Sequence, residues 1–186
     1  QKVQSAAKAE GKDPQIYCDE FASIWEKFTH KLNLSNSDFV RTSSERHKEF
    51  VQAVLQQLHN KDHFYQAEYR GFYSARQETF LTEKDKREDG TFDPIYGEVT
   101  ELAEHNYYFK LSEHQQWLIQ HIENNPKFVQ PAARRNEVLG FLKNNTLEDL
   151  CISRPKSRLE WGIPLPFDEE YVTYVWFDAL SNYASV

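Results

Sequence analysis

The chain has 186 residues, of which 39% are hydrophobic and 15% aromatic, and it contains only 6 Gly and 7 Pro. This composition supplies enough apolar material for one or two packed cores and excludes a disordered or collagen-like chain. With 22 Lys and Arg against 29 Asp and Glu, the formal net charge is −7. Such a charge disfavours binding of a polyanion over the whole surface but leaves room for a local basic patch.

Three further features concern the setting in which the chain works. No apolar run approaches the roughly 20 residues that span a bilayer, and no signal-peptide pattern opens the chain. We therefore expect a soluble, intracellular protein, cytoplasmic or alternatively mitochondrial. Cys18 and Cys151 lie far apart without a partner spacing, which is typical of reduced core residues. Because Met is absent and the chain opens on Gln1, we expect it to be a piece of a longer protein.

The first third of the chain predicts three helices. Residues 2–10 are rich in Ala, Lys and Gln and stop at Gly11. Residues 15–32 repeat apolar side chains at steps of three and four, so a second helix should bury one stripe. That stripe contains Phe21, Ile24, Trp25, Phe28 and Leu32. Ser43 or Ser44 can cap a third helix. Its expected buried face consists of Phe50, Val51, Val54, Leu55 and Leu58.

The pattern changes after residue 60. Residues 63–75 interleave aromatic and polar side chains, which is typical of a strand or hairpin, and residues 106–111 predict a further strand. Residues 83–93 predict a solvated, charged loop. Ser112 is expected to cap one helix and Pro131 to open another. The inward side chains of these two helices should be Trp117, Leu118 and Ile122, then Val138, Leu139 and Leu142.

The last part predicts two short apolar strands, residues 150–153 and 171–177, separated by a Pro-rich link. The second shows little alternation, as expected of a strand covered on both faces of a parallel sheet. Asp178 is placed to cap a final helix. Together the order of elements predicts an α/β core that is interrupted by a smaller insertion and cut at both ends.

Several segments share a resemblance to one family. They are QKVQSAAKAEGKDP from residue 1, DFVRTSSERH from residue 38, NYYFKLS, ARRNEVLGFLK, and the long run ISRPKSRLEWGIPLPFDEEYVTYVWFDALSNY near the end. In this order and spacing, the chain resembles the middle of the methionyl-tRNA synthetases, which are class I aminoacyl-tRNA synthetases. The resemblance covers essentially all 186 residues.

The resemblance implies a domain organisation. Residues 1–60 would belong to the Rossmann-like class I catalytic domain, and residues 61–152 to a small α+β connective peptide insertion. Residues 153–186 would return to the catalytic domain. This insertion is short, whereas the related synthetases for leucine, isoleucine and valine carry a much larger editing insertion, so methionine is favoured as the amino acid.

The resemblance also implies an activity. Family members activate L-methionine with ATP and Mg²⁺ to methionyl-adenylate and transfer the methionyl group to methionine tRNA. The HIGH and KMSKS motifs of the family are not in this chain, so the rest of the synthetase would have to supply them and the piece alone should be inactive. The alternative is a non-catalytic, synthetase-like module for tRNA binding or assembly. A synthetase for another amino acid is a third hypothesis.

The resemblance assigns the amino-acid side-chain pocket to Trp176, Ala179, Leu180 and Tyr183, the last three on the first turns of a helix. Aromatic surface suits a thioether, and Ala179 leaves room. From pattern alone, Trp176 reads instead as a core tryptophan.

The resemblance gives Arg154, in the motif ISR, a catalytic role in amino-acid binding and adenylate formation, in part by pairing with an acidic residue that would precede Gln1. A planar guanidinium suits a carboxylate and a developing phosphate charge. From pattern alone, Arg154 reads instead as part of an exposed loop cluster. Arg134, Arg135, Lys156 and Arg158 are candidate contacts to tRNA phosphates, with a solvated helix face as the alternative for the first two.

The insertion departs from a zinc pattern found in many members of the family, C-x-x-C followed by C-P-x-H-G. Ser74, Gln77, Asp93 and Tyr96 stand at the ligand positions, while Pro94 and Gly97 are retained. Because these side chains do not reproduce a structural zinc site, we predict no zinc. The knuckle should be held instead by packing of Phe72, Tyr73, Phe80, Phe92 and Tyr96. The histidines give no competing metal pattern; we expect surface positions for His105, His114 and His121.

Overall fold

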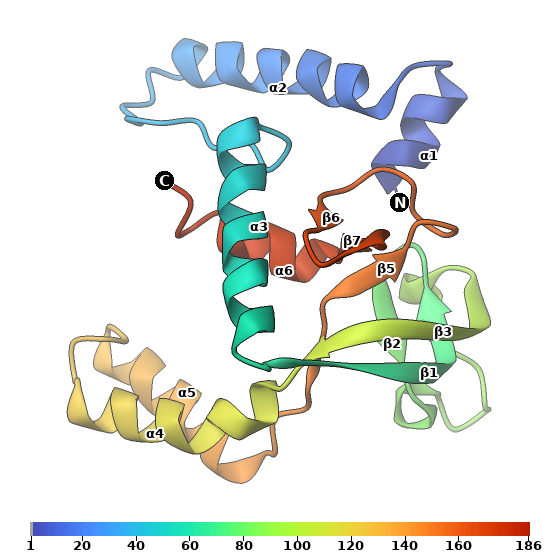
Figure 1. Cartoon of the computed structure of the whole chain (residues 1–186). Helices are drawn as coiled ribbons and strands as arrows, with labels where there is room; N and C mark the ends of the chain where they lie inside the picture. The colour runs from blue at the N-terminus through green and yellow to red at the C-terminus, as the bar shows by residue number, and fades with distance from the viewer. Residues whose placement is uncertain (1) are drawn as a thin grey trace.

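Three helices open the computed structural model, which describes residues 2–186; Gln1 lies outside it. Helix α1 spans Lys2–Ala9, α2 spans Pro14–Lys31 and α3 spans Glu45–Asn60. The side chain of Asp13 caps α2 by accepting the N–H groups of its first turn, and the Ser44 side chain caps α3. In Figure 1, α1 and α2 form a layer at the top, and α3 runs down from it to the sheet.

The apolar stripe of α2 does not lie in the core, contrary to the sequence prediction. The main packing partner of α2 is α1, and Trp25 is 59% exposed. The other members of the stripe are also exposed, namely Phe21, Ile24, Phe28 and Leu32. An apolar period identifies which side of a helix would be buried, but whether a neighbour covers that side depends on tertiary structure.

A four-stranded antiparallel sheet follows, with the strand order β2-β1-β3-β4. Its long strands are β1, Phe64–Ser74, and β3, Val99–Phe109, which pair from Phe64 opposite Phe109 to Ser74 opposite Val99. The short edge strands are β2, Thr79–Leu81, and β4, Leu150–Cys151. The predicted strand at residues 63–75 is confirmed, while β3 begins seven residues earlier than the predicted start at 106.

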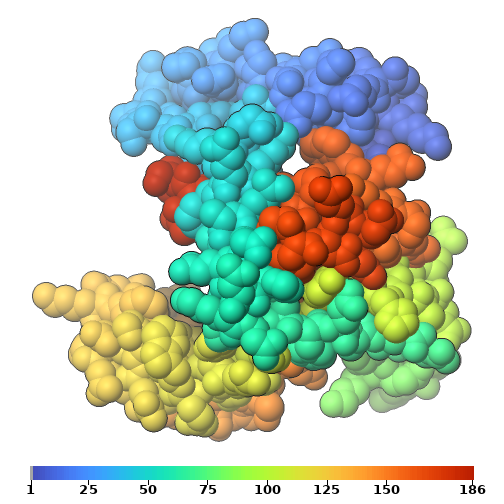
Figure 2. All heavy atoms as spheres, viewed as in Figure 1, coloured from blue at the N-terminus to red at the C-terminus, as the bar shows by residue number. Residues whose placement is uncertain are grey.

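Two helices protrude from the sheet as a separate lobe, seen at the lower left of Figure 2. Helix α4 spans Gln115–Asn124 and α5 spans Ala132–Asn144, directly after Pro131 as predicted. The buried side chains between them are Ile119, Ile122 and Leu142, whereas Trp117 and Val138 are exposed.

Ser112 does not cap α4. It lies in a 3₁₀ turn, Leu111–His114, that precedes the helix, and its hydroxyl donates to Asp149 at 2.6 Å. The carboxylate of Asp149 also accepts the backbone N–H of Ser112, so the serine ties the lobe to the segment that leads into β4.

A second, three-stranded sheet carries the last helix. It comprises β5, Ser153–Pro155, β6, Pro164–Leu165, and β7, Asp168–Thr173, in the order β5-β7-β6. Helix α6, Val175–Ser181, begins two residues after β7 ends.

Three predictions for this region are wrong. The strand predicted at residues 171–177 ends at Thr173, and β7 pairs antiparallel with both neighbours rather than parallel. Asp178 lies in the first turn of α6, whose N-cap is Tyr174. A short apolar run does not by itself distinguish a strand from a buried helical turn.

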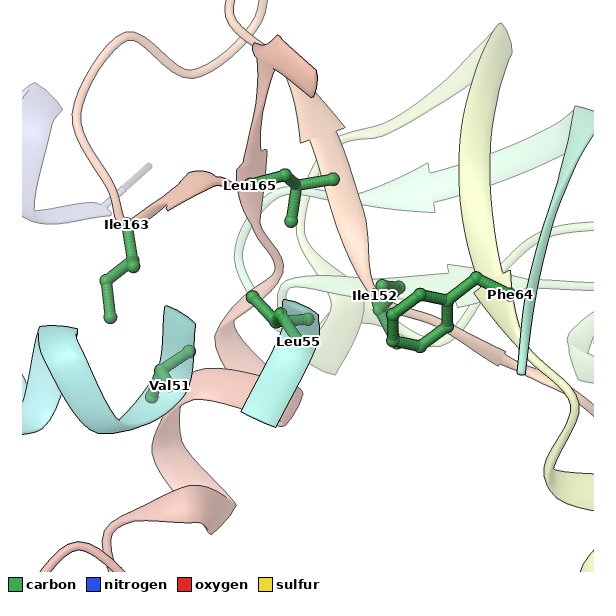
Figure 3. Close-up of a cluster of buried hydrophobic side chains, with 6 residues drawn as sticks. All are labelled: Val51, Leu55, Phe64, Ile152, Ile163 and Leu165. Carbon is green, nitrogen blue, oxygen red and sulfur yellow. The ribbon is translucent and has the colours of Figure 1, made fainter. Parts of the chain in front are cut away.

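The main core joins α3 to both sheets (Figure 3). Its buried side chains are Val51, Leu55, Phe64, Ile152, Ile163 and Leu165. The predicted inward face of α3 is thus confirmed for Val51 and Leu55. Both cysteines are free, and Cys151 is buried as expected, whereas Cys18 is only half-buried. No helix within residues 2–186 combines the length and the apolar character that crossing a membrane requires.

The core assignment predicts the effect of truncating α3. Leu55→Ala should lower the free energy of unfolding by about 2–5 kcal/mol, because it leaves a cavity in a fully buried site. Gln57→Ala, at an exposed position of the same helix, should change it by less than about 0.5 kcal/mol. Urea denaturation followed by circular dichroism measures both, and equal losses would contradict the assignment.

Candidate active site

Arg154 lies at the centre of the site. It stands on β5 and is only 5% exposed. Its guanidinium carbon lies 4.7 Å from the ring centre of Tyr73 and 4.2 Å from those of Phe80 and Tyr174. The interpretation of Arg154 as part of an exposed loop cluster is therefore wrong. Three aromatic faces stabilise a buried cation, each by about 0.5–2 kcal/mol.

The carboxylate that pairs with Arg154 comes from the four-stranded sheet. Glu104, on β3, is buried, and its Oε2 lies 3.4 Å from Arg154 Nη1. Its other oxygen, Oε1, accepts a shorter bond of 2.9 Å from Nε of Arg158, which is half exposed. The resemblance placed an acidic partner before Gln1 and missed Glu104. The signal was available in the segment ELAEHN, because Leu102, Glu104 and Asn106 alternate on the buried face of β3.

A hydrogen-bonded chain fixes the orientation of Glu104. Asn106 donates from Nδ2 to Glu104 Oε2 at 3.1 Å and accepts the hydroxyl of Ser153 on Oδ1 at 3.2 Å. The Ser153 oxygen in turn accepts the N–H of Tyr107 at 2.8 Å. Ser153 is adjacent to Arg154, so the same network positions both the carboxylate and the strand that carries its cation.

A cavity of about 30 Å³ adjoins this pair, which is room for one or two water molecules. Its lining residues are Tyr73, Glu78, Glu104, Arg154, Arg158, Leu159, Tyr174 and Val175. The Nη2 of Arg154 is buried and has no hydrogen-bond partner within residues 2–186. A buried cationic donor short of a partner is a site for a carboxylate or phosphate oxygen.

The tyrosines around the guanidinium are neutral at physiological pH. Burial raises the pKa of both Tyr73 and Tyr174, and the charge of Arg154 opposes that rise. Tyr174 also donates its hydroxyl to the backbone oxygen of Glu78. The cavity wall therefore includes the charged guanidinium of Arg154, which lies among neutral rings. Glu104 partly neutralises the guanidinium on one side.

Helix α6 starts at this cavity and carries the predicted pocket residues. Trp176 is 47% exposed, so the interpretation of it as a core tryptophan is wrong. Ala179 is half-buried, Leu180 is exposed, and Tyr183 is 81% exposed in the turn beyond the helix end at Ser181. At steps of three, four and seven residues, these four side chains share one side of α6 and its continuation. Tyr174 and Val175 line the cavity, so the start of α6 lies beside Arg154, whereas none of these four side chains lines the cavity itself.

The zinc-like knuckle is closed by hydrogen bonds. Ser74 donates from its hydroxyl to the backbone oxygen of Tyr96 at 2.6 Å, and Gln77 donates from Nε2 to that of Ile95 at 3.0 Å. Asp93 caps the short turn Pro94–Tyr96 by accepting the N–H of Ile95. Within residues 2–186, no three or more His, Cys, Asp or Glu side chains are grouped as metal ligands.

Aromatic packing supports the knuckle, as predicted for four of its five aromatic residues. Phe72 packs on Phe92 with ring centres 5.0 Å apart, and Tyr73 packs on Phe80 at 5.4 Å. Tyr96, the fifth, contributes its backbone oxygen to Ser74.

Comparison with known proteins decides the family. The model of a family described as tRNA synthetases class I (M) matches residues 1–89 and 93–186. The chain belongs to this family. A Methionine--tRNA ligase from Deinococcus radiodurans is 42% identical over 98% of this chain and 28% of its own length. That from Streptomyces coelicolor is 39% identical over 100% of this chain and 35% of its own length.

A solved structure agrees with the class I synthetase fold. The Mycobacterium tuberculosis methionyl-tRNA synthetase in complex with methionyl-adenylate superposes with a TM-score of 0.82 at 33% identity. The match covers 99% of this chain and 36% of that protein. The chain therefore spans about a third of the length of the synthetases it matches.

The basic residues singled out from the sequence of this class I synthetase segment do not form one patch. Arg134 and Arg135 lie on α5 in the protruding lobe, and Arg134 pairs with Glu137 at 2.6 Å. Lys156 and Arg158 follow directly after β5, a strand that lies away from this lobe (Figure 1). Arg158 is already engaged by Glu104.

The burial of Glu104 predicts a stability effect. Glu104→Gln should lower the free energy of unfolding by about 1–3 kcal/mol, because it removes the charge that compensates a buried guanidinium. The matched control is Glu101→Gln, at an exposed position of the same strand, which should be close to neutral. Thermal or urea unfolding of both variants tests this, and a neutral Glu104→Gln would refute the compensating role.

The hydrogen-bonded knuckle predicts independence from zinc. Purified protein should contain no stoichiometric zinc, and EDTA should leave its melting temperature unchanged, because Ser and Gln provide no thiolate ligands. Elemental analysis and a thermal scan with and without the chelator measure this. About one zinc per chain, or a melting temperature that falls with EDTA, would show the prediction to be wrong.

Proposed function

We propose that this chain forms part of the site that activates L-methionine with ATP in a methionyl-tRNA synthetase. The observation that carries the proposal is the buried guanidinium of Arg154, whose Nη2 has no hydrogen-bond partner within residues 2–186 and which shares a cavity with Tyr174 and Val175 at the start of α6. Support also comes from the similarity to a synthetase bound to methionyl-adenylate, the product that such a site would form.

The reaction needs a cation at the position that Arg154 would occupy. A carboxylate oxygen of methionine attacks the α-phosphorus of ATP, a new P–O bond forms, and the bond to pyrophosphate breaks. Arg154 can bind the carboxylate before attack and stabilise charge on the phosphoryl oxygens during it. Glu104 holds the guanidinium through Nη1 and leaves Nη2 for the substrate, so the arginine side chain needs to reorganise less as negative charge develops on the phosphoryl oxygens.

Mg²⁺ would enter with the nucleotide. Residues 2–186 provide no carboxylate cluster for it, and Mg²⁺ is commonly held by substrate phosphates with few protein ligands. The ion would supply charge neutralisation on the pyrophosphate leaving group. The nucleotide-binding HIGH and KMSKS motifs belong to the rest of the synthetase, so we expect residues 1–186 alone not to catalyse adenylate formation.

The exposed side of α6 would bind the methionine side chain. Trp176 and Tyr183 offer aromatic rings to the thioether, each contact being worth about 0.3–1.5 kcal/mol. Ala179 and Leu180 would complete an apolar wall, and burial of the side chain adds about 1.5–3 kcal/mol. Because apolar fit discriminates only roughly 10–200-fold per methylene, the position of this wall matters for selectivity.

In the second half-reaction, the methionyl group would pass to methionine tRNA. Arg158 lines the cavity and Lys156 lies two residues before it, so these two are the stronger candidates for a contact with the acceptor end, whereas Arg134 and Arg135 would meet a different part of the tRNA. We further propose that residues 61–152 form the connective peptide between two parts of the catalytic domain, residues 1–60 and 153–186. The enzyme would act in the cytoplasm.

The role of Arg154 is tested by a charge-conserving change in the full-length enzyme. Arg154→Lys should lower methionine-dependent ATP–pyrophosphate exchange by at least about 100-fold, because an ammonium cannot reproduce the planar fork. Arg70→Lys, at an exposed site of β1, should retain wild-type exchange. Unchanged exchange in Arg154→Lys would overturn the proposal, and a full-length protein without exchange for any amino acid would favour the non-catalytic module.

The pocket assignment is tested at Trp176. Trp176→Ala in the full-length enzyme should raise the KM for methionine about tenfold or more while leaving the KM for ATP within twofold, because one wall of the side-chain site is lost. Trp117→Ala removes another exposed tryptophan, in the lobe, and should change neither value. Equal effects of the two substitutions would place the methionine site elsewhere.

A further inference from the structure

A buried polar cluster lies between α3 and α6. His47, near the start of α3, is 0% exposed. Its Nε2 lies 2.7 Å from Asp178 Oδ1, and its Nδ1 lies 2.9 Å from Ser185 Oγ. These partners follow His47 by 131 and 138 residues. One imidazole thus joins α3 to Asp178 in α6 and to Ser185 in the turn that follows α6.

The hydrogen bonds fix the arrangement of protons. An ionised Asp178 can only accept, so Nε2–H of His47 donates to it, while the Ser185 hydroxyl proton is shared between Nδ1 of His47 and the backbone oxygen of Asn182, which lie 2.9 and 3.3 Å from Ser185 Oγ. Burial raises the pKa of Asp178, and the hydrogen bond from His47 opposes that rise, which is the sign expected of a bond to the ionised carboxylate.

The same three residue types occur in hydrolases, but the geometry here does not support nucleophilic catalysis. Ser185 is buried, at 6% exposure, so a substrate carbonyl has no access to its oxygen. Its hydroxyl also lies within 3.3 Å of the backbone oxygen of Asn182. The cluster is therefore a structural connection.

The connection reaches the proposed methionine wall directly. Asp178 lies between Trp176 and Ala179 in sequence, and Ser185 follows Tyr183 by two residues. Helix α6 has 7 residues and no side-chain N-cap bond, so its own hydrogen bonds do not fix its position. Its placement depends on contacts such as those with His47.

Helix α3 supplies a fixed reference for those contacts. Val51 and Leu55 anchor it in the core, and Ser44 accepts the backbone N–H of His47 at 3.4 Å. The imidazole therefore projects from the capped end of a helix that packs, through the core, against both sheets. Phe177, next to Asp178, packs against that same core.

We propose that His47 is a positioning residue for the amino-acid pocket, which it holds in place through Asp178 on α6 and Ser185 in the turn beyond. The proposal rests on the proposed function of the exposed side of α6. Its consequence is that loss of either bond displaces the wall formed by Trp176, Ala179, Leu180 and Tyr183 relative to Arg154. A displacement of about 1 Å at a binding site can cost up to roughly 100-fold in rate.

The test uses the full-length enzyme and conservative variants. Ser185→Ala and Asp178→Ala should each raise the KM for methionine by about tenfold, with the KM for ATP within twofold of wild type. Asp178→Asn retains an acceptor for Nε2–H and should restore the KM for methionine to within about threefold of wild type. His59→Gln, an exposed histidine on α3, is the control and should match wild type.

A second measurement separates positioning from general destabilisation. In a His47→Gln background, Ser185→Ala should have little further effect on the KM for methionine, because both substitutions break the same bond. Unchanged methionine KM in Ser185→Ala and Asp178→Ala, or fully additive effects with His47→Gln, would overturn the proposal. Failure of the proposed function is distinguishable from failure of this inference. In the first case Arg154→Lys and Trp176→Ala would themselves leave exchange and the KM for methionine unchanged, and the His47 variants would change stability alone.

Discussion

The burial of one cation organises the candidate site. A guanidinium out of water is costly unless charge and hydrogen bonds compensate it, and for Arg154 the compensation comes from elements far apart in sequence. Glu104 on β3 supplies the negative charge, and Tyr73, Phe80 and Tyr174 supply ring faces. Both sheets and the start of α6 thus converge on one side chain. The remaining unpartnered Nη2 makes this convergence chemically useful, because the cluster satisfies the charge without using every donor.

The two sheets have different tasks around this point. The long pair β1 and β3 carries most of the polar support, since alternation along β3 directs Leu102, Glu104 and Asn106 to the buried face. The short sheet of β5, β6 and β7 instead places Arg154 and delivers the chain into α6. Hydrogen bonds from Ser153 to Asn106 join the two. The position of α6 therefore depends on both sheets and, through His47, on α3.

Local patterns in the sequence predicted local structure well. The inward face of α3 followed from its apolar period, and the strand at residues 63–75 from its aromatic alternation. The motif resemblance singled out Arg154 and residues on and just after α6, although it named neither Glu104 nor the bonds of His47. Those contacts join residues separated by 50 and by more than 130 positions, so no local period encodes them. The exposed apolar stripe of α2 shows the same limit of local patterns. An amphipathic period identifies the apolar side of a helix, but it does not specify which other element, if any, covers that side.

The knuckle between β1 and the turn Pro94–Tyr96 has a consequence for the conditions under which this part of the chain folds. Its closing contacts join Ser74 and Gln77 to backbone oxygens, and neither side chain can be oxidised as a thiol can. On the prediction that the knuckle binds no zinc, folding of this segment would draw nothing from the cellular zinc pool, and residues 72–97 contain no cysteine that peroxide could oxidise. A synthetase with this knuckle would keep the architecture around Tyr73, and with it one ring face of the Arg154 site, during metal starvation and oxidative stress.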